Sequence, residues 1–468
     1  MKNRSIAIVL LGAACVYAGC AVGPNYHPPQ PSAPAQFSNG VQPGVTTNQP
    51  VTNWWAGFHD EELTKLVGWA ASSNLDIRVA TANLLQARAL RLSAKADFLP
   101  VVNGVASYNN VKYSQAALFD FSGTPRQQEL YDIGFDATWE LDIFGRLRRA
   151  RAASFAAVEA ADSARRDLFV SVAAEVARNY FDVRGGQNEL AVLRRNADNQ
   201  NETLKLTQAR LDAGSGTDLD VARARAELND TLAAIPPVES SIAHAMHRIG
   251  VLTGRQPEAM AEELRAAGPI PALPDVVAIG DPAQLLRRRP DIRAAERNLA
   301  AATSRIGVAV ADLFPRVTFN GAIGLEASSF SRLTGPASDT RSFGPSITWA
   351  ALDYGHVRSR ILAARAQADS QLAQYEQAVL TSLEETENAL VDFGRARARQ
   401  DFLAESVKAS QAAADLARSR YDNGASDFLT VLDAERVLLT AQDQLAQTQT
   451  TTATALVAVY KALGGGWE

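Results

Sequence analysis

Residues 96–100 read Ala-Asp-Phe-Leu-Pro, and residues 311–315 read Ala-Asp-Leu-Phe-Pro. The two stretches are 215 residues apart, and the same spacing relates matching residues on their N-terminal sides. On their C-terminal sides, matching residues are 210 apart. The matched pairs include Asp76 and Asp291, Asn83 and Asn298, Gly145 and Gly355, Gly214 and Gly424. Self-similarity at a fixed spacing indicates a repeated structural unit. The chain of 468 residues is therefore predicted to contain two tandem copies of one unit.

Each copy contains two segments with a β-strand pattern, although the alternation from 101 to 113 is less regular than in the others. From 131 to 143, apolar residues occupy every second position and mostly acidic or small residues lie between them. We predict strands at about 100–115, 130–144, 315–327 and 341–352. A soluble sheet also alternates, but these lengths match the roughly 9 to 11 residues that a tilted strand needs to cross a bilayer.

Four strands per chain have a consequence if they span a membrane. An open sheet edge cannot sit in lipid, because its backbone groups would have no partners. Three copies would supply twelve strands, an even number that closes readily into a barrel. A shared, trimeric barrel is therefore the expected assembly.

Long helical stretches follow the strands in each copy. Residues 146–211 and 356–421 are free of proline, and each would form a helix of roughly 100 Å. Gly214 and Gly424 are expected to end them, so that the chain turns back into second helices near 219–234 and 428–462. Glycines midway along the long helices, Gly185-Gly186 and Gly394, are expected to weaken or bulge them.

The first 20 residues have the pattern of a secretory signal that ends in a cysteine. Two basic residues precede an apolar run from 6 to 16, which is too short to span a bilayer as a helix. Small residues then lead to Cys20, as at a bacterial lipoprotein cleavage site, and several acyl chains would anchor the protein stably. The alternative is an ordinary signal peptide with Cys20 incidental. We predict a signal peptide at 1–19 and a lipidated, proline- and glycine-rich tether at 20–53.

Composition and motifs argue against nucleic-acid binding, enzymatic activity and metal binding. The net charge of -5 argues against a nucleic-acid binder. The sequence has no His-Glu-x-x-His, Gly-x-Ser-x-Gly or phosphate-binding glycine loop, and both cysteines lie in the first 20 residues. We therefore predict no enzyme, no metal site and no cofactor. The basic run 287–289 before Pro290 is interpreted as the end of one helix and the proline start of the next.

Several short motifs occur in a fixed order along the chain. They are Cys20 with Gly23-Pro24 and Tyr26, Trp54-Trp55 with Phe58, Arg288-Arg289-Pro290-Asp291 with Glu296, Leu352-Asp353-Tyr354-Gly355, Tyr421 with Gly424, Val431-Leu432-Asp433-Ala434, and Leu463-Gly464-Gly465-Gly466-Trp467. Each is weak alone, but together with the repeat they are specific. In this order they resemble the TolC-like outer-membrane factors, in their lipoprotein (NodT-like) branch.

The resemblance implies an α+β membrane protein that forms a homotrimer. Its twelve-stranded transmembrane β-barrel would have four strands per protomer, continued by a long periplasmic α-helical barrel with a mixed α/β equatorial region. Residues 54–285 and 286–468 would be the two repeats. The implied location is the outer membrane, lipid-anchored and extending into the periplasm. The implied partners are outer-membrane lipid, a periplasmic adaptor (membrane fusion) protein and an inner-membrane transporter.

The resemblance also implies roles for individual residues. The tips around Gly214 and Gly424 would contact the adaptor. Residues just after the tips, Asp220, Leu429 and Asp433, would form rings of three that constrict the channel. From the sequence alone, Asp220 could equally be an acid at a helix start, and Leu429 could pack between helices. Ser426 stands where some relatives carry a basic residue, so the closed state is expected to rely less on salt bridges.

The function that follows is the outer-membrane channel subunit of a tripartite efflux system. It would passively conduct drugs or other toxic small molecules. Two alternatives stay open at this point: a type I protein-secretion channel with the same fold, and a coiled-coil lipoprotein that never forms a pore.

Overall fold

The computed structural model describes residues 21–114 and 126–466. The predicted signal peptide and Cys20 lie outside these residues. The chain divides into two compact units. Unit 1 contains Asn83–Ala161 and Ala294–Tyr375 with the N-terminal segment up to Gln30, and unit 2 contains Pro31–Ala82, Asp162–Arg293 and Glu376–Glu468.

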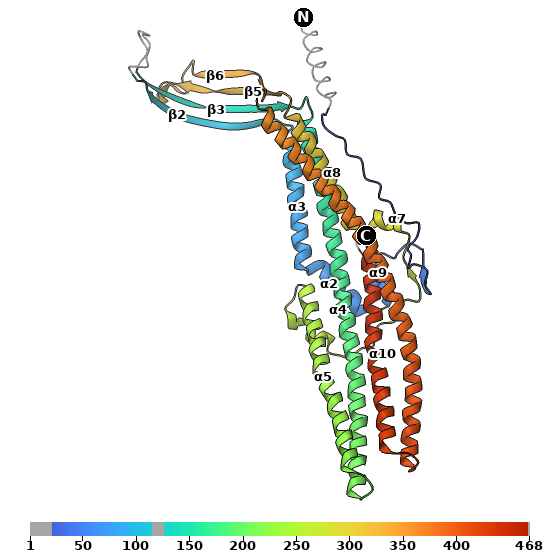
Figure 1. Ribbon diagram of the computed structural model, residues 1–468. Coiled ribbons are helices and arrows are strands. Elements are labelled where there is room, and N and C mark those ends of the chain that lie inside the picture. Colours follow the sequence, from blue (N-terminus) through green and yellow to red (C-terminus); the bar gives the residue numbers. More distant parts are fainter. Residues whose placement is uncertain (1–20, 115–125, 467–468) are drawn as a thin grey trace. The chain divides into compact units, whose positions relative to one another are not determined.

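Unit 1 carries a four-stranded antiparallel sheet in the order β2-β3-β5-β6 (Figure 1). The strands are β2 (Val101–Lys112), β3 (Gln127–Leu141), β5 (Arg316–Ala327) and β6 (Asp339–Thr348). The register pairs apolar with apolar residues on one face, as at Tyr131↔Tyr108 and Trp139↔Phe319. Polar pairs such as Asp136↔Asn103 lie on the other face, because successive side chains alternate.

The helices of the two repeats match in length. α3 (Leu75–Ala96) and α8 (Pro290–Ala311) have 22 residues each, and α5 (Asp218–Leu252) and α10 (Phe428–Ala462) have 35 each. α4 (Arg146–Asp212) has 67 residues and α9 (Tyr354–Asp422) has 69. The predicted tandem repeat of strands and long helices is confirmed. In unit 2 the hairpins α4–α5 and α9–α10 lie side by side (Figure 1).

The first hairpin differs from the expectation. We predict its second helix to end near 234, before Pro236-Pro237, and this is wrong because α5 continues through both prolines to Leu252. Prolines remove two helical N–H donors, but both are exposed, so water can bind the carbonyls that lose their partners. Beyond them, one face of α5 is buried in the hydrophobic core, and this packing sustains the helix. The buried residues are Ile242, Ala245, Met246, Ile249 and Leu252.

The mid-helix glycines do not interrupt the long helices. Instead they allow close contacts, because a Cβ at Gly185 would lie 1.9 Å from the Thr450 hydroxyl, and one at Gly394 would lie 2.0 Å from the Gln42 side chain. The expectation of bulges at these glycines is therefore wrong. Their role is to let a neighbouring segment approach the helix surface.

Short elements cover the helices of unit 2. They are η1 (Trp54–Phe58), α2 (Glu61–Ser73), η2 (Pro257–Met260), α6 (Ala261–Leu264), α7 (Pro282–Arg288) and the parallel pair β1 (Val45–Thr46) with β4 (Val277–Ala278). Trp54 stacks on Tyr460 at 5.2 Å, and Phe58 meets Phe181 at 5.0 Å. Phe37, from the proline- and glycine-rich segment that was predicted to be a tether, is also in this core.

Among the described residues, no helix is both long enough and apolar enough to cross a membrane. As predicted for the basic run, α7 ends at Arg288 and α8 begins at Pro290.

Candidate functional site: the helical hairpin tips

Each hairpin turns through a glycine with a left-handed backbone. Gly214 has φ +74° and Gly424 has φ +70°, and a side chain at either position would be strained. The N–H groups of the two turns bond back to the ending helix in the same way. Ser215 donates to Arg210 O at 2.9 Å, and Ala425 donates to Arg420 O at 2.8 Å. These bonds satisfy carbonyls that would otherwise lack partners at the end of the helix.

The helices that follow the turns start with the same two residue types in opposite order. In the first tip, the Thr217 hydroxyl accepts from the Asp220 N–H at 3.2 Å and donates to the Asp220 carboxylate at 2.7 Å. In the second tip, Asp427 accepts from the Thr430 N–H at 3.0 Å and from its hydroxyl at 2.6 Å. The hydroxyl and N–H of Thr430 hold the pKa of Asp427 below its usual value. Each pair satisfies an N–H that has no partner within the helix.

The predicted constriction residues lie just after these caps. Leu429 is 52% exposed, and Asp433 lies one turn further along α10 on the same face. The Asp433 carboxylate accepts a hydrogen bond from Arg436 at 2.8 Å. Asp220 has the cap contacts described above, and none of its described contacts reaches α10. Their role in closing a pore stays a prediction.

Leu219 belongs with these residues, although its place here was not predicted from the sequence. Leu219 precedes Leu429 by 210 residues and is similarly exposed, at 56%. The repeat spacing itself carries the signal, because it relates every position near one tip to a position near the other.

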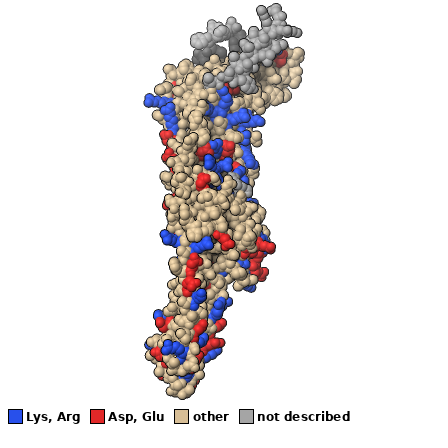
Figure 2. Space-filling model, turned by 90° about the vertical axis from the view of Figure 1, so that its right-hand side faces the viewer, with Lys and Arg blue, Asp and Glu red and all other residues tan. Residues whose placement is uncertain are grey.

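The two hairpins pack against each other near the tips. Phe428 and Val431 of α10 are buried with Ala224 of α5 and Ala417 of α9. Arg210 of α4 lies over the ring of Tyr421 at 3.9 Å, a cation–π contact. Figure 2 shows Lys, Arg, Asp and Glu side chains interspersed over the lower end of the molecule, where the tip of α9–α10 lies. No group of acidic, histidine or cysteine side chains in the described residues could hold a metal ion.

A buried charge cluster lies farther along the helices of unit 2. Arg289 is 7% exposed and donates to Asp291 at 2.8 Å and to Glu385 at 2.7 Å. It also donates to Ala462 O at 2.9 Å. Asp167 lies near this cluster, where burial and the negative charge of Asp291 raise its pKa to about 6. Arg289 therefore joins α9 and α10 to the start of α8. The raised pKa of Asp167 means that nearby positive charges do not offset the cost of burying its carboxylate.

The comparison with known proteins then identifies the family. The family described as "Outer membrane efflux protein" matches residues 66–255 and again residues 282–465, once for each repeat. The chain belongs to the outer membrane efflux protein family. Membership makes it an outer-membrane channel protein of an efflux system, not an enzyme, and it confirms the resemblance to the TolC-like factors.

Individual relatives of this efflux protein cover nearly the whole chain. Nodulation protein T of Rhizobium leguminosarum bv. trifolii is 34% identical over 96% of this chain and 95% of its own. The toluene efflux pump outer membrane protein TtgI of Pseudomonas putida is 31% identical over 100% of this chain and 99% of its own. The solved structure of the outer-membrane channel OprN is 43% identical, with a TM-score of 0.90 over 96% of this chain and 100% of its own.

Proposed function

We propose that three copies of the chain form one channel, with a twelve-stranded barrel in the outer membrane and a barrel of long helices in the periplasm. The sheet supports this, because β2 and β6 each pair with only one strand among the described residues. Unpaired edges are costly in lipid. The apolar face of the sheet is exposed, with Phe135 at 61%, Ile323 at 65% and Phe343 at 77%. Pairing β2 of one copy with β6 of the next would leave no edge.

The proposed division of the chain follows from this assembly. Residues 1–19 are a signal peptide, 20–53 a tether lipidated at Cys20, and 54–285 and 286–468 the two repeats. The short elements of unit 2 would form the equatorial region. Within unit 1, the Val22 N–H donates to Phe144 O at 3.1 Å, so the start of the tether is held next to the end of β3.

A second contact fixes the tether in unit 1. The Tyr26 hydroxyl donates to Glu296 of α8 at 2.7 Å. Burial and the neighbouring Glu296 carboxylate raise the pKa of Tyr26, so the hydroxyl keeps its proton at any physiological pH. The segment is therefore held on the protein from its first described residues onward.

The tips are the proposed contact surface for a periplasmic adaptor, which would link the channel to an inner-membrane transporter. Asp220, Leu429 and Asp433 are the proposed constriction, and Leu219 would add to it. The exposure of both leucines supports this, because burying them against the same leucines of neighbouring copies would stabilise the closed trimer. A ring of leucines can close a pore by excluding water, and a ring of carboxylates favours cations.

The proposed mechanism is passive conduction. The sequence has no nucleotide-binding motif, so the transporter would supply the energy. Opening would require the hairpins to loosen around the tips, biased by contacts with the adaptor. The proposed cargo is small toxic molecules, which the similarity to the toluene efflux pump protein TtgI supports.

Accumulation of a fluorescent efflux dye tests this function. Cells that lack the gene should accumulate more dye than the parent strain, and a plasmid copy should restore the parental level. A plasmid copy with Cys20→Ser reports separately on the anchor. Unchanged dye accumulation after deletion, in a strain that has no related channel, would contradict small-molecule efflux. If that deletion strain also failed to release a secreted protein, the protein-secretion channel would be the better interpretation. A protein that migrates only as a monomer after membrane extraction would contradict the trimer.

A further inference from the structure

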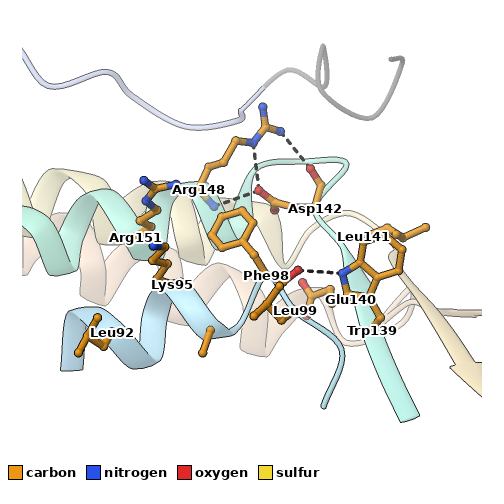
Figure 3. Close-up of a pocket in the computed structure, with 11 residues that line it drawn as sticks. Leu92, Lys95, Phe98, Leu99, Trp139, Glu140, Leu141, Asp142, Arg148 and Arg151 are labelled. Carbon is orange, nitrogen blue, oxygen red and sulfur yellow. Dashed lines mark hydrogen bonds and ion pairs between the residues drawn. The ribbon is translucent and has the colours of Figure 1, made fainter. Parts of the chain in front are cut away.

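Unit 1 contains a recess where the sheet meets the helices, between the end of α3, the end of β3 and the start of α4 (Figure 3). Its volume is about 730 Å³. Apolar side chains make most of its wall, and Leu92 and Leu99 are 68% and 64% exposed. Lys95 of α3 and Arg151 of α4 extend from neighbouring helices at one end of it (Figure 3).

The acidic groups of the recess are already neutralised by other residues. Glu140 binds Arg146 at 2.6 Å, and Asp142 binds Arg148 at 3.0 Å and accepts from the Leu147 N–H at 2.9 Å. The side chains of Lys95 and Arg151 form no ion pair or hydrogen bond with any residue that the structure describes. The recess is therefore apolar with two uncompensated cations at one end.

The recess borders the apolar face of the sheet. Trp139 and Leu141 line it, and they belong to the face of β3 whose residues pair with Tyr108 and Phe319. The Trp139 indole N–H donates to Phe98 O at 3.0 Å, which fixes the ring at the end of the strand. Tryptophan near the end of a membrane-spanning strand is typical of the boundary between a membrane and water.

We propose that this recess binds a phospholipid of the inner leaflet of the outer membrane, with its phosphate on Lys95 and Arg151. The acyl chains would cover Leu99, Trp139 and Leu141. The proposal rests on the proposed placement of the sheet across the outer membrane. Charge complementarity selects the occupant, because the diacylglycerol of a lipidated Cys20 carries no phosphate and would leave both cations unpaired.

The second repeat provides an internal comparison. Trp349 matches Trp139, and its indole N–H likewise donates to a helix-end carbonyl, Leu313 O, at 3.0 Å. At the positions that match Lys95 and Arg151, however, stand Val310 and Ile361. The tryptophan is therefore a feature of both junctions, whereas the cations belong to one. We expect one phosphate site per chain, not two.

Native mass spectrometry of the purified full-length protein tests the site. The probes are phosphatidylglycerol and a diacylglycerol with the same acyl chains, added to protein in detergent. The wild type should retain phosphatidylglycerol and not diacylglycerol. Lys95→Gln with Arg151→Gln should weaken this retention about tenfold or more, because each lost phosphate contact is charge-assisted. The matched control is Lys205→Gln with Arg195→Gln, which removes the same charges from exposed positions elsewhere on α4 and should leave retention unchanged.

Two results would overturn the lipid site. One is equal retention of phosphatidylglycerol by the wild type and the Lys95→Gln, Arg151→Gln variant. The other is a wild type that retains neither lipid, which would mean that the recess is filled by another part of the assembly. Conductance in planar bilayers, measured on the same samples, separates this inference from the proposed function. A conducting wild type without the lipid site overturns only the inference, whereas a wild type that neither trimerises nor conducts overturns the channel.

Discussion

Asp167→Asn should stabilise the protein at neutral pH. The carboxylate of Asp167 is half-buried, and burial together with Asp291 raises its pKa from the usual 3.8 to about 6. Arg289 and Lys461 oppose this shift, and Glu385 adds to it. A shift of roughly two pKa units corresponds to about 3 kcal/mol of unfavourable free energy for the ionised form. Because water reaches part of the side chain, about 1–2 kcal/mol is the expected net effect.

The dependence on pH follows from the direction of this shift. The folded state holds the Asp167 proton more tightly than the unfolded state, so the contribution of Asp167 to stability is most favourable below pH 4. It falls as the pH rises from about 4 through about 6, and is constant above that range. Asparagine has nearly the same shape without the charge. The gain from Asp167→Asn should therefore be full at pH 7.5 and vanish near pH 4.

Thermal unfolding followed by circular dichroism, at pH 4 and pH 7.5, measures this difference. The variant should have the higher midpoint at pH 7.5 and the same midpoint as the wild type at pH 4. The matched control is Asp198→Asn, which removes a carboxylate from an exposed position of the same helix and should change neither midpoint. The reasoning would be refuted if the two proteins had equal midpoints at pH 7.5. It would also be refuted if the variant still had the higher midpoint at pH 4, where the Asp167 carboxyl is protonated in the folded wild type.

Three further predictions concern the tips and the tether. Leu429→Ala combined with Asp433→Ala should raise the leak conductance of the closed channel in planar bilayers, because both side chains narrow the proposed constriction. An unchanged leak conductance would show that Leu429 and Asp433 do not form the constriction. Gly424→Ala should destabilise its tip by about 1 kcal/mol, since a Cβ is strained at φ +70°, and faster hydrogen exchange there is the readout. Gly68→Ala, in the middle of a helix with open space around it, is the control and should be neutral or stabilising. Tyr26→Phe should loosen the tether by about 1 kcal/mol through loss of its hydrogen bond to α8. Limited proteolysis should then cut this segment faster, and an unchanged rate would show that packing alone holds it.

The elements with a strict period were the predictable part of the fold. Alternation over 131–143 predicts β3, and the repeat relates the less regular strand at Val101–Lys112 to the alternating segment of β5, Arg316–Ala327. The end of α5 was not predictable, because tertiary packing beyond Pro236-Pro237 outweighs two lost hydrogen bonds. The same limit applies to Gly185 and Gly394, whose function depends on a segment distant in sequence.

The site was predictable to the level of the turn. Matching glycines locate both tips, and their backbone conformation confirms the turns. The partner of a side chain was not predictable, since nothing local says that Arg210 lies over Tyr421 or that Arg289 reaches Glu385. The roles of Asp220, Leu429 and Asp433 depend on neighbouring copies of the chain, so they stay predictions.

The reversed caps of the two hairpins affect how the two repeats should be compared with each other. One helix starts with Thr217 and Asp220, and the other with Asp427 and Thr430. In both pairs a side-chain oxygen of the first residue accepts from the N–H of the second, although the residue types are exchanged. A comparison that scores single positions counts two mismatches here and misses the shared hydrogen bond. Equivalent helix starts in such repeats are therefore found by comparing pairs of positions.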